Sequence, residues 1–242
     1  MIRVEMQSIQ SITKINNEAI RSYESGQLLS AENFLAKALF FLNKLRERLH
    51  SEILEQCTEK SFQFQTLKSS IIRWSKPFPL HHVEKDVIMF TRGIFLEEHD
   101  HLLDKASSFS PYLEMITLAL FYNASMINHF YSYLAGEDSL ISNGAYIGYE
   151  VAFAIFNKID RQSSNISIQM KLLKLALFNN IGVLFCTDMC RFRDAAECFE
   201  AFREEIPSLI EVLLDGEDMT TTEAEQLSSN LLAVPCVATP AA

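Results

Sequence analysis

Apolar side chains recur every three or four residues along most of the chain, which is the spacing of one face of a helix. Residues 5–25 carry this pattern first, with apolar side chains at Ile9, Ile12, Ile15, Ala19, Ile20 and Tyr23. Gly26 interrupts it as a helix-ending glycine does, and a second helical pattern begins at Ser30 and continues toward Ile53. Two helices joined by so short a turn predict an antiparallel hairpin, here over residues 5–56.

Further helices are predicted in the second half of the chain. Ser110 followed by Pro111 is a typical helix start, and this helix is expected to end near Leu134. The helical pattern then continues over 140–158, 167–185 and 191–205. These segments predict two more hairpins, 111–158 and 167–206. A further turn is expected at 208–214 and a last helix at 221–232.

A long connection, residues 57–110, separates the first hairpin from the second. Its first part, 57–85, is rich in Ser, Thr, Gln and Lys and contains Pro77 and Pro79, which disfavour helix. Residues 86–96 are instead apolar and rich in branched and aromatic side chains, so we expect a buried extended segment or short strand. Residues 226–234 are the candidate partner for a small two-stranded pairing.

The predicted hairpins share a pattern of small residues. Their second helices read Ala31-x3-Leu35-x2-Ala38, Ala145-x3-Tyr149-x2-Ala152 and Ala195-x3-Phe199-x2-Phe202. Their first helices carry a small residue at Ala19, Ala124 and Gly182. Small side chains allow two antiparallel helices to approach closely. In this respect the chain resembles the tetratricopeptide (TPR) repeat, a helix–turn–helix unit of about 34 residues.

The resemblance is strongest in the first unit, where Ala19 and Ala31 have the family's spacing and Gly26 stands at the turn. The second unit has a longer inter-helix loop, and no unit carries the family's tryptophan, since Trp74 lies in the connection. A generic bundle of helical hairpins is the alternative. The resemblance implies an all-α right-handed superhelix, a single domain over 1–214, whose first helices line a concave groove. Residues 215–242 are an acidic and then apolar tail.

Proteins of this kind bind a peptide or helix of a partner and catalyse no reaction. Groove positions carried over from the family are Asn16, Tyr23, Ser125, Asn128 and Asn179. An asparagine amide suits such a role because it offers a donor and an acceptor to an extended backbone. The alternative is that these asparagines cap or bridge the hairpins internally.

Composition and charge narrow the class of partner. The chain has 242 residues, 48% of them hydrophobic, with only 7 Gly and 6 Pro, which excludes a wholly disordered protein. Its formal charge is −10, from 31 acidic and 21 basic side chains. Nearly all of the excess negative charge lies in residues 197–225, and this acidic segment suits a basic partner. Because no basic stripe is present, nucleic-acid binding is not expected.

Compartment and membrane association follow from the cysteines and the apolar segments. The 5 Cys are an odd number without regular spacing, and no signal peptide is recognisable, so we expect a reducing cytoplasm, or the nucleus. Cys186, Cys190 and Cys198 are interpreted as core residues. Residues 115–136 are uncharged and long enough to cross a membrane. Their Asn, Ser and His side chains instead favour a buried helix of a soluble protein.

Candidate chemistry is sparse. Glu97–Asp104 is the densest group of possible ligands, with His99, His101 and Asp104 as weak metal candidates. On a helix these side chains would not share one face, so we interpret the segment as a solvated turn and expect no metal or cofactor. Phosphate loops and nucleophile elbows are absent from the sequence. The alternative function is a helical bundle that binds a metal or an apolar ligand, an enzyme among them.

Overall fold

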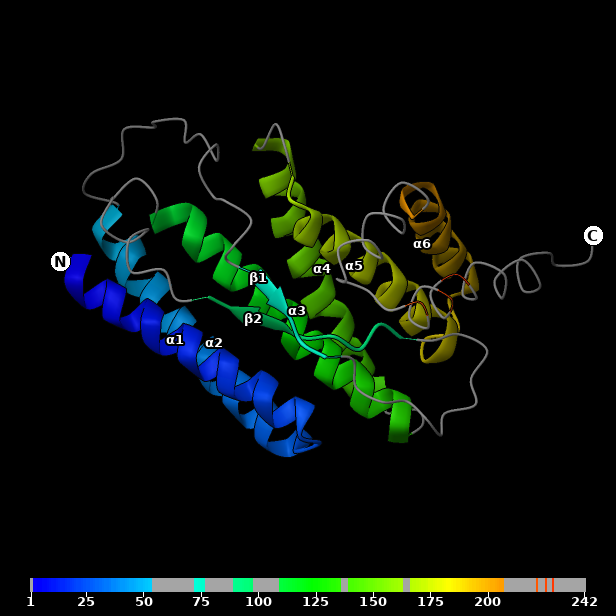
Figure 1. The fold of residues 1–242 in the computed structure, drawn as a ribbon, viewed down its shortest axis with the longest axis horizontal. Helices are drawn as coiled ribbons and strands as arrows, with labels where there is room; N and C mark the ends of the chain where they lie inside the picture. Colours follow the sequence, from blue (N-terminus) through cyan, green and yellow to red (C-terminus); the bar gives the residue numbers. More distant parts are fainter. Residues whose placement is uncertain are drawn as a thin grey trace, which may run out of the picture.

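The computed structural model describes residues 2–53, 72–76, 89–97, 109–135, 139–162 and 166–206, together with Thr221, Glu225 and Ser228. The elements in chain order are α1 (Ile2–Glu24), α2 (Leu28–Ile53), β1 (Ile72–Trp74), β2 (Ile94–Leu96), α3 (Phe109–Ala135), α4 (Ser139–Gln162), α5 (Ile168–Thr187) and α6 (Phe192–Glu205). The prediction of a mostly helical fold with a small two-stranded element is confirmed for these residues (Figure 1).

Helices that follow one another in the chain pack as hairpins, α1 with α2, α3 with α4 and α5 with α6. Successive hairpins meet through α2 against α3 and through α4 against α5, so the three pairs follow one another across the molecule (Figure 1). Among the first helices, α3 also contacts both α1 and α5. Strand β2 packs on both α1 and α3, and β1 pairs with β2.

Local signals in the sequence set the helix ends. Gly26 adopts a left-handed φ of +77° in the turn between α1 and α2, a conformation that glycine adopts without steric cost. Its N–H donates to the Tyr23 carbonyl at 2.9 Å. Helix α2 begins at Leu28, earlier than the predicted Ser30, because the Gln27 carbonyl already accepts from the Ala31 N–H. At α5, the Ser167 hydroxyl accepts from the Met170 N–H as an N-cap.

The core lies along α3 and α5. The prediction that 115–136 is a buried helix is confirmed for the described part of α3, where most side chains, polar ones among them, are buried. Of the described helices, α5 is long and apolar enough to cross a membrane, but 72% of its most apolar window is buried inside the protein. Packing against neighbouring elements therefore accounts for the apolar composition of α5.

The two strands form an antiparallel pair with the register Ile72↔Leu96, Arg73↔Phe95 and Trp74↔Ile94. The prediction of a buried extended segment at 86–96 is confirmed for residues 89–96, all of which are buried. The candidate partner 226–234 lies outside the described residues apart from Ser228, which is helical. Strand β2 pairs with β1, a strand inside the predicted loop 57–85, because Ile72 and Trp74 alternate with exposed Arg73 to give a buried and a solvated face.

Several predictions lie outside the described residues. These are the turn at 208–214, the metal candidates His99, His101 and Asp104, and almost all of the tail 215–242. Within the tail, Thr221, Glu225 and Ser228 are helical.

Candidate functional site: a strand held by asparagines

Residues 89–97 cross the first helices of all three hairpins, and an asparagine from each helix holds their backbone. Asn123 on α3 accepts from the Ile94 N–H at 2.7 Å and donates to the Ile94 carbonyl at 2.8 Å. Asn180 on α5 makes the same pair of bonds to Phe90, at 2.7 and 2.9 Å. Asn17 on α1 makes it to Leu96, at 2.8 and 2.7 Å. Each amide therefore binds one residue of the segment through both backbone groups.

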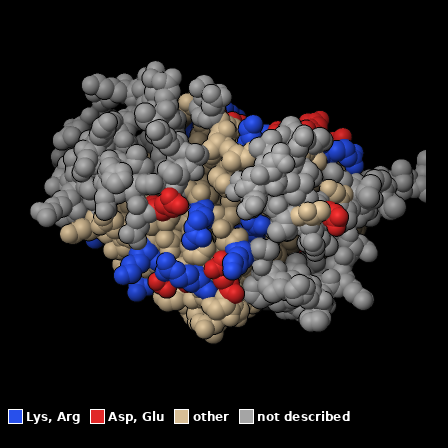
Figure 2. Space-filling view, in the orientation of Figure 1, with Lys and Arg blue, Asp and Glu red and all other residues tan. Residues whose placement is uncertain are grey.

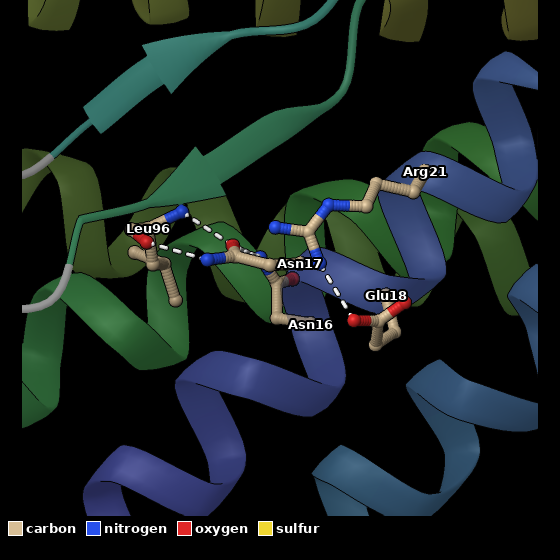
Figure 3. A network of polar contacts seen from close by, with 5 residues as sticks. All are labelled: Asn16, Asn17, Glu18, Arg21 and Leu96. Atoms are coloured by element: carbon tan, nitrogen blue, oxygen red, sulfur yellow. Dashed lines mark hydrogen bonds and ion pairs between the residues drawn. The ribbon is translucent and has the colours of Figure 1, made fainter.

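Figure 3 shows the α1 end of this arrangement. Asn17 points from the helix toward the backbone of Leu96, whereas Arg21, one turn further on, turns to Glu18, to which it donates at 2.6 Å. An ion pair this exposed contributes little to stability. The neutral amide of Asn17, and not the charged pair beside it, therefore makes this contact with the strand.

The asparagines take the place of a neighbouring strand. In an antiparallel pair, the backbone groups of alternate residues point to opposite edges. Gly93 directs both of its backbone groups to Ser75, the residue after β1, since its carbonyl accepts from the Ser75 N–H and its N–H donates to the Ser75 hydroxyl, each at 2.8 Å. Ile94 and Leu96 direct theirs to the helices. One edge of β2 is therefore satisfied by β1 and the other by side-chain amides.

Two tyrosines and a further asparagine complete the contacts to the strand. Tyr23 on α1 donates to the Thr91 carbonyl at 3.0 Å, and Tyr122 on α3 donates to the Arg92 carbonyl at 3.1 Å. Burial raises the pKa of both tyrosines well above the usual value, so their hydroxyls stay protonated and able to donate. Asn16 donates to the Ile94 carbonyl at 2.9 Å and accepts from Asn123 at 2.8 Å.

Aromatic side chains cover the other side of the segment. Trp74 of β1, 8% exposed, packs edge-on against Phe90 and Tyr122, with ring centroids 5.6 and 5.8 Å apart. The Arg73 guanidinium lies 4.3 Å from the centre of the Phe95 ring. The segment is therefore enclosed between the first helices and β1, with hydrogen bonds to its backbone on one side and aromatic packing on the other.

Gly93 lies close to the side chain of Ile20 on α1. A Cβ atom placed on this glycine would lie 2.6 Å from the Ile20 Cδ1 atom on α1. Such a distance is well inside van der Waals contact. Its φ is not in the left-handed region, where Gly26 alone lies among the described glycines. Space beside the tip of the Ile20 side chain, and not backbone conformation, therefore favours a glycine at this position.

The residues carried over from the TPR resemblance divide into two groups. Asn16 and Tyr23 contact the 89–97 segment directly. Asn179 is buried on α5 and donates to Asn180, which contacts the segment. Ser125 faces α4, where a Cβ on Gly148 would lie 2.0 Å from its hydroxyl oxygen. Asn128 is half-buried on α3.

The asparagines that bind the strand in pairs of bonds, Asn17, Asn123 and Asn180, are not among the residues carried over. They share a signal that the sequence contains: each stands two positions before a small residue, in Asn17-x-Ala19, Asn123-x-Ser125 and Asn180-x-Gly182. The repeat is hidden when α3, the first helix of the second hairpin, is aligned on Ala124 instead of Ser125. Contacts to the second helices support the alignment on Ser125, since Ser125 faces Gly148 and Gly182 faces the Phe199 ring.

A second polar cluster lies where α5 ends. The Asp188 carboxylate accepts from the hydroxyls of Ser132, Ser142 and Thr187, at 2.5, 3.0 and 2.6 Å. Burial alone would raise the pKa of Asp188, but these hydrogen bonds and nearby His129 lower it below the usual value. The cluster joins α3 and α4 to the end of α5.

Other candidate chemistry is limited within the part of the chain that the structure describes. No group of three or more His, Cys, Asp or Glu side chains there is arranged to hold a metal ion. Cys186, Cys190 and Cys198 are not joined in disulfides. Cys186 and Cys198 are half-buried and Cys190 is exposed, so the interpretation of all three as core residues is wrong for Cys190, which lies in the turn between α5 and α6. Burial raises the pKa of Cys198 to about 12, which keeps it a neutral packing residue.

The charged surface is mixed in sign. On the face shown in Figure 2, Lys and Arg lie beside Asp and Glu. On α6, within the acidic segment predicted from the sequence, Glu197, Glu200 and Glu204 are exposed to solvent.

No protein-family model, curated protein or solved structure matches this chain.

Proposed function

We propose that this protein is a non-enzymatic interaction scaffold whose three hairpins are TPR-like units stacked into a superhelix. Its partner is an extended peptide that binds along the first helices, where the protein's own residues 89–97 lie. The single observation that carries this proposal is the set of paired bonds from Asn17, Asn123 and Asn180 to backbone groups. Backbone bonding of this kind accepts any extended segment whose side chains fit.

The repeat of Asn-x-small in each first helix supports the TPR-like assignment. The small residue lets the second helix approach, and the asparagine two positions earlier lies on the inner face. One sequence element therefore both builds the hairpin and presents an amide to the groove. A generic bundle needs the small residue for packing but gives no reason for the asparagine to accompany it.

The protein's own segment is a competitor of any partner. A tethered segment has an effective concentration of order millimolar, so a free peptide with the same contacts displaces it poorly. A partner therefore succeeds where it makes more contacts than residues 89–97 do. The binding test accordingly uses a full-length chain whose own segment is weakened.

Ile94→Asp is the release variant, because a carboxylate at this fully buried position is costly while every helix residue of the groove is unchanged. Leu96→Asp is the second release variant, and circular dichroism verifies that each keeps its helices. A fluorescein-labelled peptide of residues 89–97 is titrated against each chain and followed by polarisation. We expect saturable binding by the release variants and at least tenfold weaker binding by the wild type.

Addition of Asn180→Leu to the release variant removes the paired bonds to Phe90 and is expected to weaken binding at least tenfold. Asn33→Ala, an exposed asparagine of α2, is the matched control and leaves binding unchanged. A folded release variant that binds no peptide, or binding that is indifferent to Asn180, overturns the proposal.

A further inference from the structure

We infer that the groove selects a partner peptide with a glycine directly before the apolar residue that Asn123 holds. The selecting residue is Ile20 on α1. The ligand class is an extended apolar peptide of the pattern aromatic-x-x-Gly-aliphatic-x-aliphatic, which is the pattern of Phe90, Gly93, Ile94 and Leu96 in the protein's own segment. This inference rests on the proposed function, and it adds the chemistry by which one peptide is preferred over another.

The pattern follows from how each position is used. Phe90 is 4% exposed and packs against Trp74, while Ile94 and Leu96 are 0% and 1% exposed. These are the positions whose backbone groups the asparagines of α5, α3 and α1 bind. A polar or charged side chain at any of them would be buried without a partner. The spacing of the apolar positions is thus set by the spacing of the asparagines.

The glycine in this pattern is preferred for a different physical reason. Its backbone groups face Ser75, the residue after β1, and its α-carbon faces α1, where a methyl group would require the Cδ1 atom at the tip of the Ile20 side chain to shift. Ile20 is itself fully buried, so it has little freedom to move aside. Because the backbone at Gly93 is not left-handed, alanine meets no conformational obstacle, and its rejection depends on Ile20 alone.

The test compares two labelled nonapeptides, residues 89–97 with glycine and the same peptide with Gly93→Ala, on the full-length Ile94→Asp chain. We expect the alanine peptide to bind at least tenfold more weakly. Adding Ile20→Ala to the protein opens the space, so the alanine peptide is then expected to bind as tightly as the glycine peptide or more so. Alanine also makes the free peptide less flexible, which by itself would strengthen binding. This effect is opposite to the expected weakening and does not account for it.

The outcomes separate this inference from the function on which it rests. Equal binding of the two peptides to the chain with Ile20 overturns the glycine selection and leaves the proposed function standing. Binding of neither peptide to the folded chain overturns both. A cycle within the protein's own segment provides an independent measurement: Gly93→Ala is expected to lower the thermal midpoint, and less so when Ile20→Ala is present. An equal effect of Gly93→Ala in both backgrounds overturns the inference.

Discussion

Asn123 on α3 and Ile94 on β2 exchange two hydrogen bonds in a site where both residues are completely buried. The pair lies between the corresponding pairs that Asn17 and Asn180 make to either side of it along the strand. The Asn123 amide makes the two backbone hydrogen bonds that a neighbouring strand makes in an ordinary sheet. Several measurable consequences follow from this arrangement.

Replacing Asn123 with leucine keeps the approximate volume of the side chain but removes both bonds to Ile94. The Ile94 N–H is then buried without its acceptor, and Asn16 loses the donor to its oxygen. A buried polar group left in this state costs roughly 1–3 kcal/mol, so we expect the free energy of unfolding to fall by at least that amount in urea titrations. Asn43→Ala, exposed on α2, is the control; equal stability of the two variants would contradict the assigned role of Asn123.

Two glycines of α4 are expected to respond oppositely to alanine. Gly144 has open space around it, so Gly144→Ala should stabilise the protein by roughly 0.5–1 kcal/mol through helix propensity. Gly148 faces the Ser125 hydroxyl, which would lie 2.0 Å from a new Cβ, and Gly148→Ala should destabilise by roughly 1–3 kcal/mol through overpacking. The double variant Gly148→Ala with Ser125→Ala is expected to recover most of this loss. Thermal unfolding of the four proteins measures all of these effects.

The fluorescence of the chain's 1 Trp reports on the strands. Trp74 is 8% exposed and packed between Phe90 and Tyr122, so its emission should be blue-shifted and poorly quenched by acrylamide. Ile94→Asp should shift the emission to longer wavelength while the far-ultraviolet helix signal is retained. If emission and quenching in that variant match the wild type while the helices persist, β1 and β2 do not depend on the seating of Ile94 as described.

Asp188 predicts a pH dependence of stability. Because its pKa is lower in the folded protein than in the unfolded chain, the ionised carboxylate stabilises the fold at pH values above the unfolded pKa of about 3.9. This contribution is lost as the pH falls through the folded pKa. Asp188→Asn should therefore cost on the order of 1 kcal/mol at pH 7, and the difference from wild type should shrink below about pH 4.

Urea titrations of wild type and Asp188→Asn at pH 7 and pH 3 test this sign. Asp160→Asn, on α4, removes the same charge outside the Ser132–Ser142–Thr187 group and serves as the control. A difference between wild type and Asp188→Asn that is constant with pH, or larger at pH 3, would show that the ionised form of Asp188 does not stabilise this end of α5.

The sequence by itself determined the helices, their pairing into hairpins and the burial of residues 89–96, because each depends on a local periodicity or on an apolar run that requires cover. The end of α1 just before Gly26 and the start of α5 just after Ser167 likewise depend on local signals. The partner of β2 was not predicted, since β1 has three residues and only two of them, Ile72 and Trp74, face the core. A periodicity needs more positions than that to be recognised.

Only the tertiary structure decided what the asparagines hold. A sequence shows that an amide offers a donor and an acceptor, but not that the backbone of residues 90–96 lies within 3 Å of Asn17, Asn123 and Asn180. Those contacts join residues as much as 90 positions apart, and no local preference encodes such a separation. The preference for glycine at position 93 likewise comes from the tertiary structure, which places Ile20 of α1 beside it. Local chemistry set the elements, and the packing of the hairpins set which backbone their side chains hold.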